Sequence, residues 1–348
     1  MLETIGPLAF ALRAWRALTA RVPRPIRKAF RPAGRMIRVV RHILLFRAPD
    51  ELTACPACSA PGPIPLLPIP LEGRARTYGF ASGCTRCGVV FANPLPSASQ
   101  VAEVYSPQGE WGRHRQDEQE KQVSRGRLES YFEPVADIVN VVAPRPGATV
   151  LDFGCGLGGM LDGFAALGWQ TYGIEPAMKV AFARHHELLD IPASGAFDVV
   201  VLHHVLEHVT DPLTILRQIA GAVRAGGILL ISVPNLDEVA VHGEMKYCIR
   251  AGVHVLAYSG ACLAWLVAEA GFEVVSDRSG LSEDRQRHRI VLARRSETPV
   301  ARPPAPLDAA RRALARYSAA HEPRSFLRVL PVRTRTALLD LQRTEWQI

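Results

Sequence analysis

The sequence predicts an α/β protein with a mostly parallel sheet and helices on both faces. Two observations predict it. After residue 147, short apolar segments typical of strands alternate with amphipathic helical segments, and a glycine-rich turn follows the first strand. Successive parallel strands need a crossover, usually a helix, so this alternation indicates a layered α/β domain.

The expected elements follow in a regular order, four strands each followed by a helix and then two closing strands. The strands are expected over 149–154, 170–174, 197–203, 227–233, 272–277 and 289–293. The helices are expected over 160–167, 177–185, 212–223 and 259–270. Each segment has the length that its class of element usually has.

The net charge of +8 comes from the two ends of the chain. Residues 1–47 hold 11 Lys and Arg against Glu3 alone, and residues 299–348 hold 9 Arg against 4 acids. We expect a basic amphipathic helical extension over 1–48 and an Arg-rich helical tail over 297–348. Such ends suit peripheral contact with an anionic membrane, a solvated extension, or docking on an acidic partner. They carry few aromatic residues, so nucleic acid is not the expected partner.

The sequence shows no mark of secretion or membrane insertion. Arg interrupts the first 30 residues throughout, and no uncharged run of 18 residues could span a bilayer. Three of the seven cysteines are scattered in apolar context. Free thiols favour a reducing compartment, so we expect a cytoplasmic protein, with the inner face of the membrane as a further option for the basic ends.

The other four cysteines form two CxxC pairs, Cys55–Cys58 and Cys84–Cys87. A two-residue gap lets two thiolates converge on one metal, and two such pairs complete a tetrahedral site for structural zinc. A redox pair is the alternative, but it usually occurs once, beside a βαβ unit. We therefore expect a small zinc-ribbon-like, zinc-binding module over 49–96, followed by a helical linker or cap over 97–143.

The glycine-rich turn predicts a cofactor site. Gly154 and Gly156 follow the first strand, where the backbone must approach a ligand closely. Asp152 precedes the turn, where it would repel a pyrophosphate but can hold an ammonium group. Glu175 ends the second strand, where a carboxylate can accept both ribose hydroxyls. A dinucleotide-binding fold is the alternative.

Together these segments resemble the class I S-adenosylmethionine-dependent methyltransferases. The matching stretches are VLDFGCGLGG, YGIEP, FDVVVLHHVLEHVTDP and RAGGILLISVPN, in the family's order. The resemblance implies a Rossmann-like seven-stranded sheet over 144–296 and in-line methyl transfer from S-adenosylmethionine. A dinucleotide-binding fold would leave the later stretches unexplained. The cofactor-binding residues implied are Asp152, Phe153, Gly154, Cys155, Gly156, Glu175, Asp190 and His203.

One stretch departs from the family pattern. Only 22 residues separate Glu175 from Asp198, fewer than the family usually needs for a helix, a strand and the adenine loop. Asp190-Ile191-Pro192 is the best match to that loop, and we expect one strand here to be reduced.

Histidines cluster where the family places the reacting groups: His203, His204 and His208 after the third strand, and His254 after the fourth. Three interpretations stay open. His204, His208 or His254 acts as a base or orients the acceptor. His204-x-x-Glu207-His208 resembles the Glu-x-x-Glu-His element of metal-assisted methyltransferases, such as ubiquinone-pathway O-methyltransferases and small-RNA 2′-O-methyltransferases, with His replacing the first Glu. Or Glu207 and His208 only cap and brace the loop. His204 and His208 are four residues apart, so on a helical turn they would share a face.

A zinc module before such a domain resembles that of bacterial sugar C-methyltransferases and of relatives that modify glycans or natural products. The tail is too short for the larger C-terminal domain usual in those sugar enzymes. The expected acceptor is a small molecule, a saccharide or a lipid-linked glycan, with O-methylation ahead of C-methylation. RNA methylation and a non-catalytic scaffold are the alternatives.

Overall fold

A computed structural model describes ten parts of the chain, all within one compact unit over Ala48–His321. They are residues 52–70, 78–106, 109, 134–142, 145–175, 184–239, 245–249, 252–279, 288–304 and 306–321. The predicted helical extension over 1–48, most of the predicted helix over 177–185 and the tail beyond 321 lie outside the described residues.

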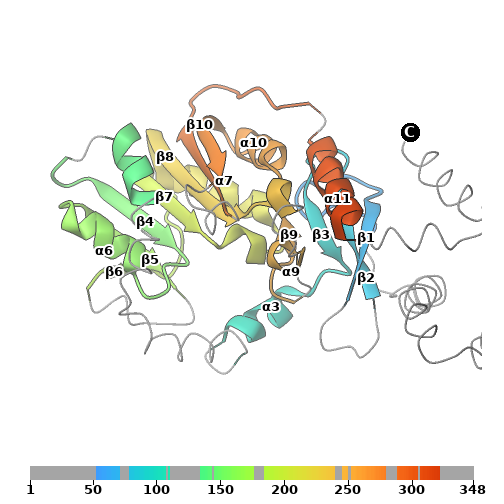
Figure 1. Ribbon diagram of the computed structural model, residues 1–348. Coiled ribbons are helices and arrows are strands. Elements are labelled where there is room, and N and C mark those ends of the chain that lie inside the picture. Colours follow the sequence, from blue (N-terminus) through green and yellow to red (C-terminus); the bar gives the residue numbers. More distant parts are fainter. Residues whose placement is uncertain are drawn as a thin grey trace, which may run out of the picture. The chain divides into compact units, whose positions relative to one another are not determined.

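A seven-stranded sheet with the strand order β10-β11-β8-β7-β4-β5-β6 forms the centre of the fold (Figure 1). Five strands are parallel: β4 (Thr149–Phe153), β5 (Gln170–Ile174), β6 (His186–Glu187), β7 (Phe197–His203) and β8 (Val223–Pro234). The last two, β10 (Phe272–Ser279) and β11 (His288–Arg295), run antiparallel, and β11 lies between β10 and β8. The predicted α/β class with a mostly parallel seven-stranded sheet is confirmed.

The short stretch after Glu175 produces the predicted reduced strand. β6 has only two residues, and it pairs with β5 through Tyr172 and His186. The missing length shortens this edge of the sheet without removing a strand.

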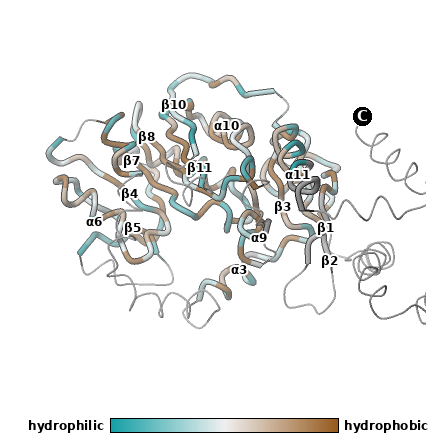
Figure 2. Tube along the Cα trace, viewed as in Figure 1, coloured by the Kyte–Doolittle hydropathy of each residue, from teal (hydrophilic) through white to brown (hydrophobic). Residues whose placement is uncertain are grey.

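Both faces of the central sheet are buried because neighbouring strand residues point to opposite sides. Val150, Val199 and Leu230 share a core cluster with α6 (Gly159–Ala166) and the helix at 134–141. The residues beside them in the strands share the other cluster with α7 (Pro212–Ala222) and α10 (Gly260–Glu269). Hydrophobic stretches along the chain follow this burial (Figure 2).

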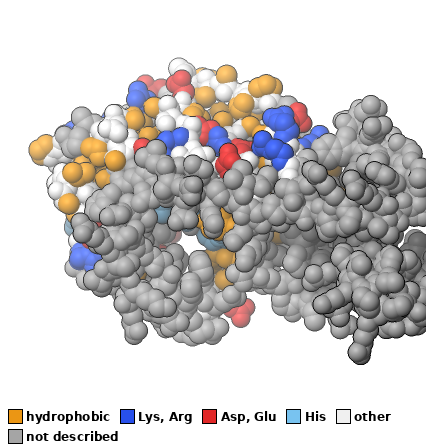
Figure 3. Space-filling model, in the orientation of Figure 1, with side chains coloured by type: hydrophobic (Ala, Val, Ile, Leu, Met, Phe, Trp, Pro, Cys, Tyr) orange, Lys and Arg blue, Asp and Glu red, His pale blue; other side chains and the backbone are white. Residues whose placement is uncertain are grey.

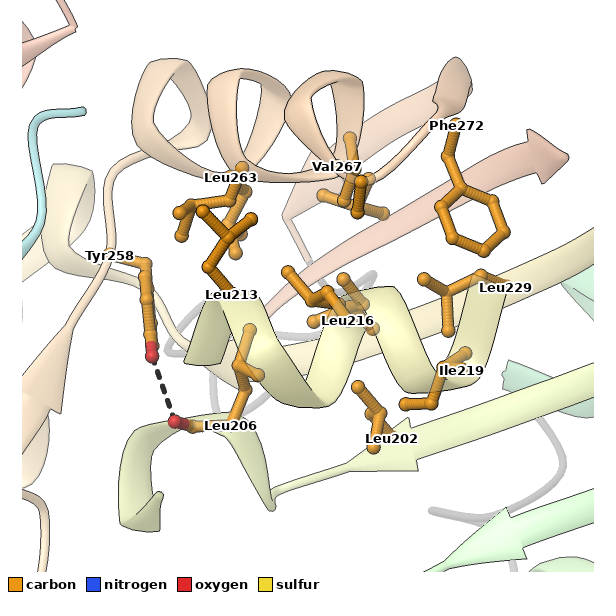
Figure 4. Close-up of a cluster of buried hydrophobic side chains, with 14 of the residues drawn as sticks. Leu202, Leu206, Leu213, Leu216, Ile219, Leu229, Tyr258, Leu263, Val267 and Phe272 are labelled. Carbon is orange, nitrogen blue, oxygen red and sulfur yellow. Dashed lines mark hydrogen bonds between the residues drawn. The ribbon is translucent and has the colours of Figure 1, made fainter. Parts of the chain in front are cut away.

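Figure 4 shows the layer under α7 and α10. Leu202 and Leu229 from the sheet meet Leu216 and Ile219 of α7, and Leu263 of α10 packs above them. α7 begins where Asp211 accepts a hydrogen bond from the Thr214 amide, and α10 begins at Ser259, which accepts one from Cys262. Side-chain caps of this kind satisfy amides that would otherwise lack partners at a helix start.

Both cysteine pairs lie in turns that precede or join strands of a second sheet, which has four antiparallel strands. Its strands are β1 (Ile64–Pro70), β2 (Tyr78–Gly83), β3 (Val90–Asn93) and β9 (Leu256–Ala257). β9 follows β8 and α9 (Met245–Cys248) in the chain, and α11 (Leu307–His321) packs on the same sheet. The domain boundaries at 49–96, 97–143, 144–296 and 297–348 stay predictions. The pairing of β9 and the packing of α11 join residues from three of these regions in one sheet and its cover.

The described part of the surface carries charged side chains of both signs. Figure 3 shows acidic and basic side chains interspersed on the face in view. Arg302 and Arg217, for example, both pair with Glu269. Within the described ranges, every helix is too short or too polar to cross a bilayer.

Candidate functional site

The four cysteines of the two CxxC pairs converge on one point. The Sγ atoms of Cys55 and Cys87 are 3.7 Å apart, those of Cys58 and Cys84 are 3.5 Å apart, and all four lie within 4.8 Å of one another. The hydrogen bond with Cys55 lowers the pKa of the Cys58 thiol to about 7. Four sulfur ligands at this spacing fit a single tetrahedral metal ion.

Tight turns hold each pair in this arrangement. The Ser59 amide donates to the Cys55 carbonyl at 3.0 Å, and the Gly88 amide donates to the Cys84 carbonyl at 2.9 Å. Gly88 has φ +78°, and a Cβ there would lie 2.6 Å from the backbone of Pro306. The second turn therefore requires glycine, for its conformation and for the close approach of the chain before α11.

The glycine turn after β4 is closed by hydrogen bonds to the end of β5. The Gly154 amide donates to the Ile174 carbonyl at 2.7 Å, and the Gly156 amide donates to Glu175 Oε2 at 3.0 Å. Gly154 has φ +81°, and a Cβ there would lie 2.6 Å from the Val205 side chain. A side chain at 154 would therefore displace the turn after β7.

Asp152 is a buried carboxylate in β4, only 3% exposed. Its Oδ1 has no hydrogen-bond partner among the described residues. Burial, together with the charge of Glu175, raises the pKa of Asp152 to about 7. An unpaired buried carboxylate is costly, so this position suits a cationic ligand that would pair with it.

A cavity of about 690 Å³ opens beside the turn, the size of a small-molecule site. Phe153, Glu175 and Asp190, three of the predicted cofactor residues, line it together with apolar side chains from 188–193 and α7. Leu189 at its edge is 81% exposed. The other predicted residues do not line this cavity. Asp152 lies in β4, Gly154, Cys155 and Gly156 lie in the turn that follows it, and His203 ends β7.

The histidines after β7 are organised around Glu207, which lies in the short helix η2 (Leu206–His208) and is fully buried. His204 Nδ1 lies 3.0 Å from Glu207 Oε1, and His208 Nε2 lies 3.8 Å from the same oxygen. Burial would raise the pKa of Glu207, but the His208 charge and the His204 hydrogen bond lower it to about 2. The carboxylate is therefore ionised.

The expected helical face shared by His204 and His208 is wrong. His204 precedes η2 and adopts φ +55°, a left-handed conformation that non-glycine residues rarely take. Its amide donates to the Ser232 carbonyl at 2.8 Å, which holds it at the end of β8. The two histidines are brought together by the Glu207 carboxylate and not by helical spacing.

His208 and His254 each hold a backbone carbonyl oxygen with the same ring nitrogen, Nδ1. His208 Nδ1 lies 2.9 Å from the Val253 carbonyl, and His254 Nδ1 lies 2.6 Å from the Tyr247 carbonyl. Carbonyl oxygens only accept, so each Nδ1 carries a proton. Burial lowers the pKa of His254 to about 4, so this ring is neutral near pH 7.

Glu207, His208 and His254 could therefore hold a metal ion. One ligand atom from each lies within 4.8 Å of the others, and Glu207 Oε2 is buried without a hydrogen-bond partner among the described residues. The backbone carbonyls that orient the two rings match the outer-shell hydrogen bonds usual around metal-bound histidine.

Three residues of this region escaped the sequence analysis. The Tyr105 hydroxyl, at the end of α3 (Ala98–Tyr105), contacts His208 Nδ1 and donates to the Val253 carbonyl at 3.4 Å. Tyr247 in α9 (Met245–Cys248) and His288 at the start of β11 contact each other through the phenol and Nε2. None of the three belongs to a local motif, and only the alternation that predicted β11 pointed near His288.

Comparison with known proteins places the chain in a family. A methyltransferase-domain family matches residues 127–277. The ubiquinone biosynthesis O-methyltransferase of Albidiferax ferrireducens is 35% identical over 132 residues, 31% of this chain and 52% of the relative. That of Xanthomonas axonopodis pv. citri is 33% identical over 177 residues, 43% of this chain and 73% of the relative. The chain thus spans about half the length of the first of these relatives.

Solved structures with a similar fold include a 1,6-didemethyltoxoflavin-N1-methyltransferase from Burkholderia thailandensis. It has a TM-score of 0.47 and 17% identity, over 66% of this chain and 100% of that one. The magnesium protoporphyrin IX methyltransferase of Synechocystis PCC 6803 has a TM-score of 0.44 and 19% identity, over 57% and 100%. On the family match and the curated relatives, the chain belongs to the class I S-adenosylmethionine-dependent methyltransferases.

Proposed function

We propose that the protein transfers a methyl group from S-adenosylmethionine to a hydroxyl oxygen of a small-molecule acceptor. The observation that carries the cofactor is the unpaired, buried Asp152 carboxylate beside a glycine turn and a cavity lined by Glu175. O-methylation is supported by the relatives, which are named O-methyltransferases. A saccharide or lipid-linked glycan acceptor stays a prediction.

In this proposal each cofactor residue has a distinct role. Asp152 pairs with the ammonium group, Glu175 accepts from the ribose hydroxyls, and Phe153 and Asp190 border the adenine. Gly154 and Gly156 leave room for the ligand, while Cys155 and His203 form the floor and the rim toward the acceptor. Glu175 also holds the Gly156 amide, so one carboxylate shapes the turn and binds the sugar.

When bound, S-adenosylmethionine supplies an electrophilic methyl group on a positively charged sulfur. The protein's task is to align the acceptor oxygen with that methyl carbon and to exclude water. His204 does not serve as the base here, because both of its ring nitrogens are engaged, with Glu207 and with His288. His254, whose Nδ1 donates to the Tyr247 carbonyl and whose ring is neutral near pH 7, is the better candidate for a base.

We propose further that Glu207, His208 and His254 hold a divalent cation, which would act as a Lewis acid for the acceptor oxygen. The cluster has two imidazole rings and a buried carboxylate oxygen that lacks a hydrogen-bond partner among the described residues, which is a donor set for a metal such as zinc or another first-row ion. His204 then acts from outside, holding the Glu207 carboxylate through Oε1.

The four cysteines are proposed to hold structural zinc, since four protein ligands leave no open position for a substrate. A cytoplasmic location stays a proposal supported by the free thiols. Peripheral contact of the basic ends with an anionic membrane stays a proposal supported by their charge. Cosedimentation of the full chain with anionic vesicles, lost on adding salt, tests the membrane contact.

Calorimetry with S-adenosylmethionine tests the cofactor site. Glu175→Ala is expected to weaken binding by about 1–3 kcal/mol, because charge-assisted hydrogen bonds to the ribose are lost. Glu273→Ala on β10 removes an exposed carboxylate far along the sheet and serves as the control. Equal affinity for wild type and Glu175→Ala would show that the ribose binds elsewhere.

The activity is tested with methyl-labelled S-adenosylmethionine and fractionated cell extract. Label is expected in a small-molecule fraction, and its transfer is expected to fall when the extract is treated with a chelator. Label in RNA would favour the alternative acceptor. No cofactor binding at millimolar concentration would favour the scaffold.

A further inference from the structure

One cluster of charged and polar side chains lies outside the sites described above. Asp162 of α6 pairs with Arg184, whose Nε lies 2.9 Å from Oδ1 and whose Nη2 lies 2.9 Å from Oδ2. His185 Nε2 lies 2.9 Å from the same Oδ1. Burial would raise the pKa of Asp162, but the hydrogen bonds from Arg184 and His185 lower it below its usual range. The proposed function gives none of these three residues a role.

The cluster also contacts the two segments that form the cofactor region. Arg184 Nη2 donates to the Leu157 carbonyl at 3.0 Å, and Leu157 lies in the glycine turn after β4. His185 Nδ1 lies 2.9 Å from Thr171 Oγ1, in β5, the strand that ends just before Glu175. The cluster therefore joins the glycine turn to the strand that carries the predicted ribose carboxylate.

The glycine turn needs such contacts because its backbone has unusual conformational freedom. Gly154, Gly156 and Gly158 have φ of +81°, +55° and +83°, so left-handed glycines alternate along the turn. A chain rich in glycine keeps one conformation only where other groups restrain it. Hydrogen bonds to the end of β5 restrain amides of the turn, and Arg184 restrains the Leu157 carbonyl.

The ion pair itself adds little to the stability of the whole protein. The side chains of Arg184 and Asp162 are 47% and 41% exposed, and water screens exposed pairs strongly. What the pair supplies is direction, because two parallel N–H···O bonds fix the plane of a guanidinium. His185, whose side chain is 2% exposed, also holds the carboxylate. A local role at the turn therefore explains the cluster better than a global one.

We propose that Arg184 is a positioning residue for S-adenosylmethionine, and that Asp162 and His185 set the direction of its guanidinium. Arg184 acts through the Leu157 carbonyl and keeps the glycine turn in the conformation that receives the cofactor. A turn that is ordered before binding loses less conformational entropy when the ligand arrives, so the ligand binds more tightly. The inference rests on the proposed function, which places the cofactor at this turn.

Calorimetry with S-adenosylhomocysteine, together with amide hydrogen exchange of the full-length protein, tests this inference. The variants are Arg184→Ala and Arg184→Lys, which keeps the charge without the planar guanidinium. Arg302→Ala is the matched control, because the Arg302 side chain is 48% exposed and pairs with Glu269 on α10. Urea denaturation of each protein records its unfolding midpoint.

Arg184→Ala is expected to weaken S-adenosylhomocysteine binding about tenfold, the equivalent of one charge-assisted hydrogen bond, with little change in the unfolding midpoint. Without ligand, its amides at residues 154–158 should exchange faster than those of the wild type. Saturating S-adenosylhomocysteine should restore the wild-type rates. Arg184→Lys should recover only part of the affinity, and Arg302→Ala should bind and exchange as the wild type does.

Four results would overturn the inference: unchanged affinity in Arg184→Ala, unchanged exchange at residues 154–158, full affinity in Arg184→Lys, or an equal loss in Arg302→Ala. Should Arg184→Ala fail to fold, the comparison of the wild type with Arg184→Lys and Arg302→Ala decides. A failure of the proposed function is separate, because the wild type would then not bind S-adenosylhomocysteine. The exchange rates of the ligand-free proteins would still show whether Arg184 holds the turn.

Discussion

The cofactor region and the histidine cluster lie along the same end of the sheet but are built in different ways. The cofactor region comes from two neighbouring strands and their turns, Asp152–Gly156 and Glu175, which pair directly as β4 and β5. The histidine cluster combines Tyr105, His204–His208, Tyr247–His254 and His288, up to 148 residues apart in its direct contacts. A local turn supports the first site, and the packing of several segments supports the second.

The cysteine-bearing sheet is hydrogen-bonded to the histidine cluster through one segment. The Ala92 amide of β3 donates to the Val255 carbonyl at 2.9 Å, and the Val255 amide donates to the Glu207 carbonyl at 2.9 Å. Val255, next to His254, is therefore hydrogen-bonded to β3 on one side and to η2 on the other. Loss of the metal from the cysteine module should therefore disturb the segment of His254 before it disturbs β4 and β5.

The largest effect is expected from Cys87→Ser. Structural zinc contributes on the order of 10 kcal/mol to a small module, so its loss should unfold the cysteine-bearing turns. Hydrogen exchange should then rise at residues 90–93 and 253–258, while β4 and β5 keep their protection. Cys248→Ser, a buried cysteine outside the cluster, should keep the zinc content of the wild type by metal analysis, whereas Cys87→Ser should lose one zinc per chain. A uniform loss of protection would show that the two regions are not separable.

Gly154→Ala should affect both regions, since it pushes the turn that carries Val205. We expect a loss of about 3 kcal/mol in unfolding free energy, from strain and overpacking, with S-adenosylmethionine affinity lowered more than tenfold. Gly147→Ala is the control: its φ of +75° gives the same backbone strain, but a Cβ there meets nothing within 4 Å. It should cost about 1 kcal/mol and leave affinity unchanged. If the two variants lost the same unfolding free energy in urea denaturation, contact with Val205 would not explain the effect at Gly154.

Asp152→Asn separates stability from binding. The pKa of Asp152 is raised to about 7 in the fold, so the folded state binds the proton more tightly than the unfolded chain does. Cofactor-free wild type should therefore lose stability as the pH rises from about 4 to about 7, by up to about 4 kcal/mol. The Asn variant should lack this loss, be the more stable at about pH 8, and bind S-adenosylmethionine more weakly. Parallel stability curves for the two proteins would contradict the assignment.

Tyr105→Phe should have the smallest effect, a loss of about 1 kcal/mol or less from one hydrogen bond at the edge of the histidine cluster. Methyl transfer should slow a few-fold, while calorimetry should show unchanged cofactor affinity. Tyr172→Phe, beside the cofactor region, should leave transfer unchanged. A weakened cofactor affinity in Tyr105→Phe would show that the two regions are coupled through α3.

The amino-acid sequence by itself determined the features that are short in range. Strand–helix alternation, the spacing of Cys55 to Cys58 and Cys84 to Cys87, and the glycines after Asp152 each depend on neighbouring residues, so their geometry follows from local chemistry. The same holds for the reduced strand β6, because 22 residues cannot hold a full one.

Tertiary structure alone decided which distant residues meet. The insertion of β11 between β10 and β8 brings His288 to His204, and the pairing of β9 with β3 ties the segment of His254 to the cysteine module. It also replaced the expected helical face with a left-handed His204 turned toward Glu207. Such contacts depend on strand order and on burial shared by the whole core, and no periodicity within one segment encodes them.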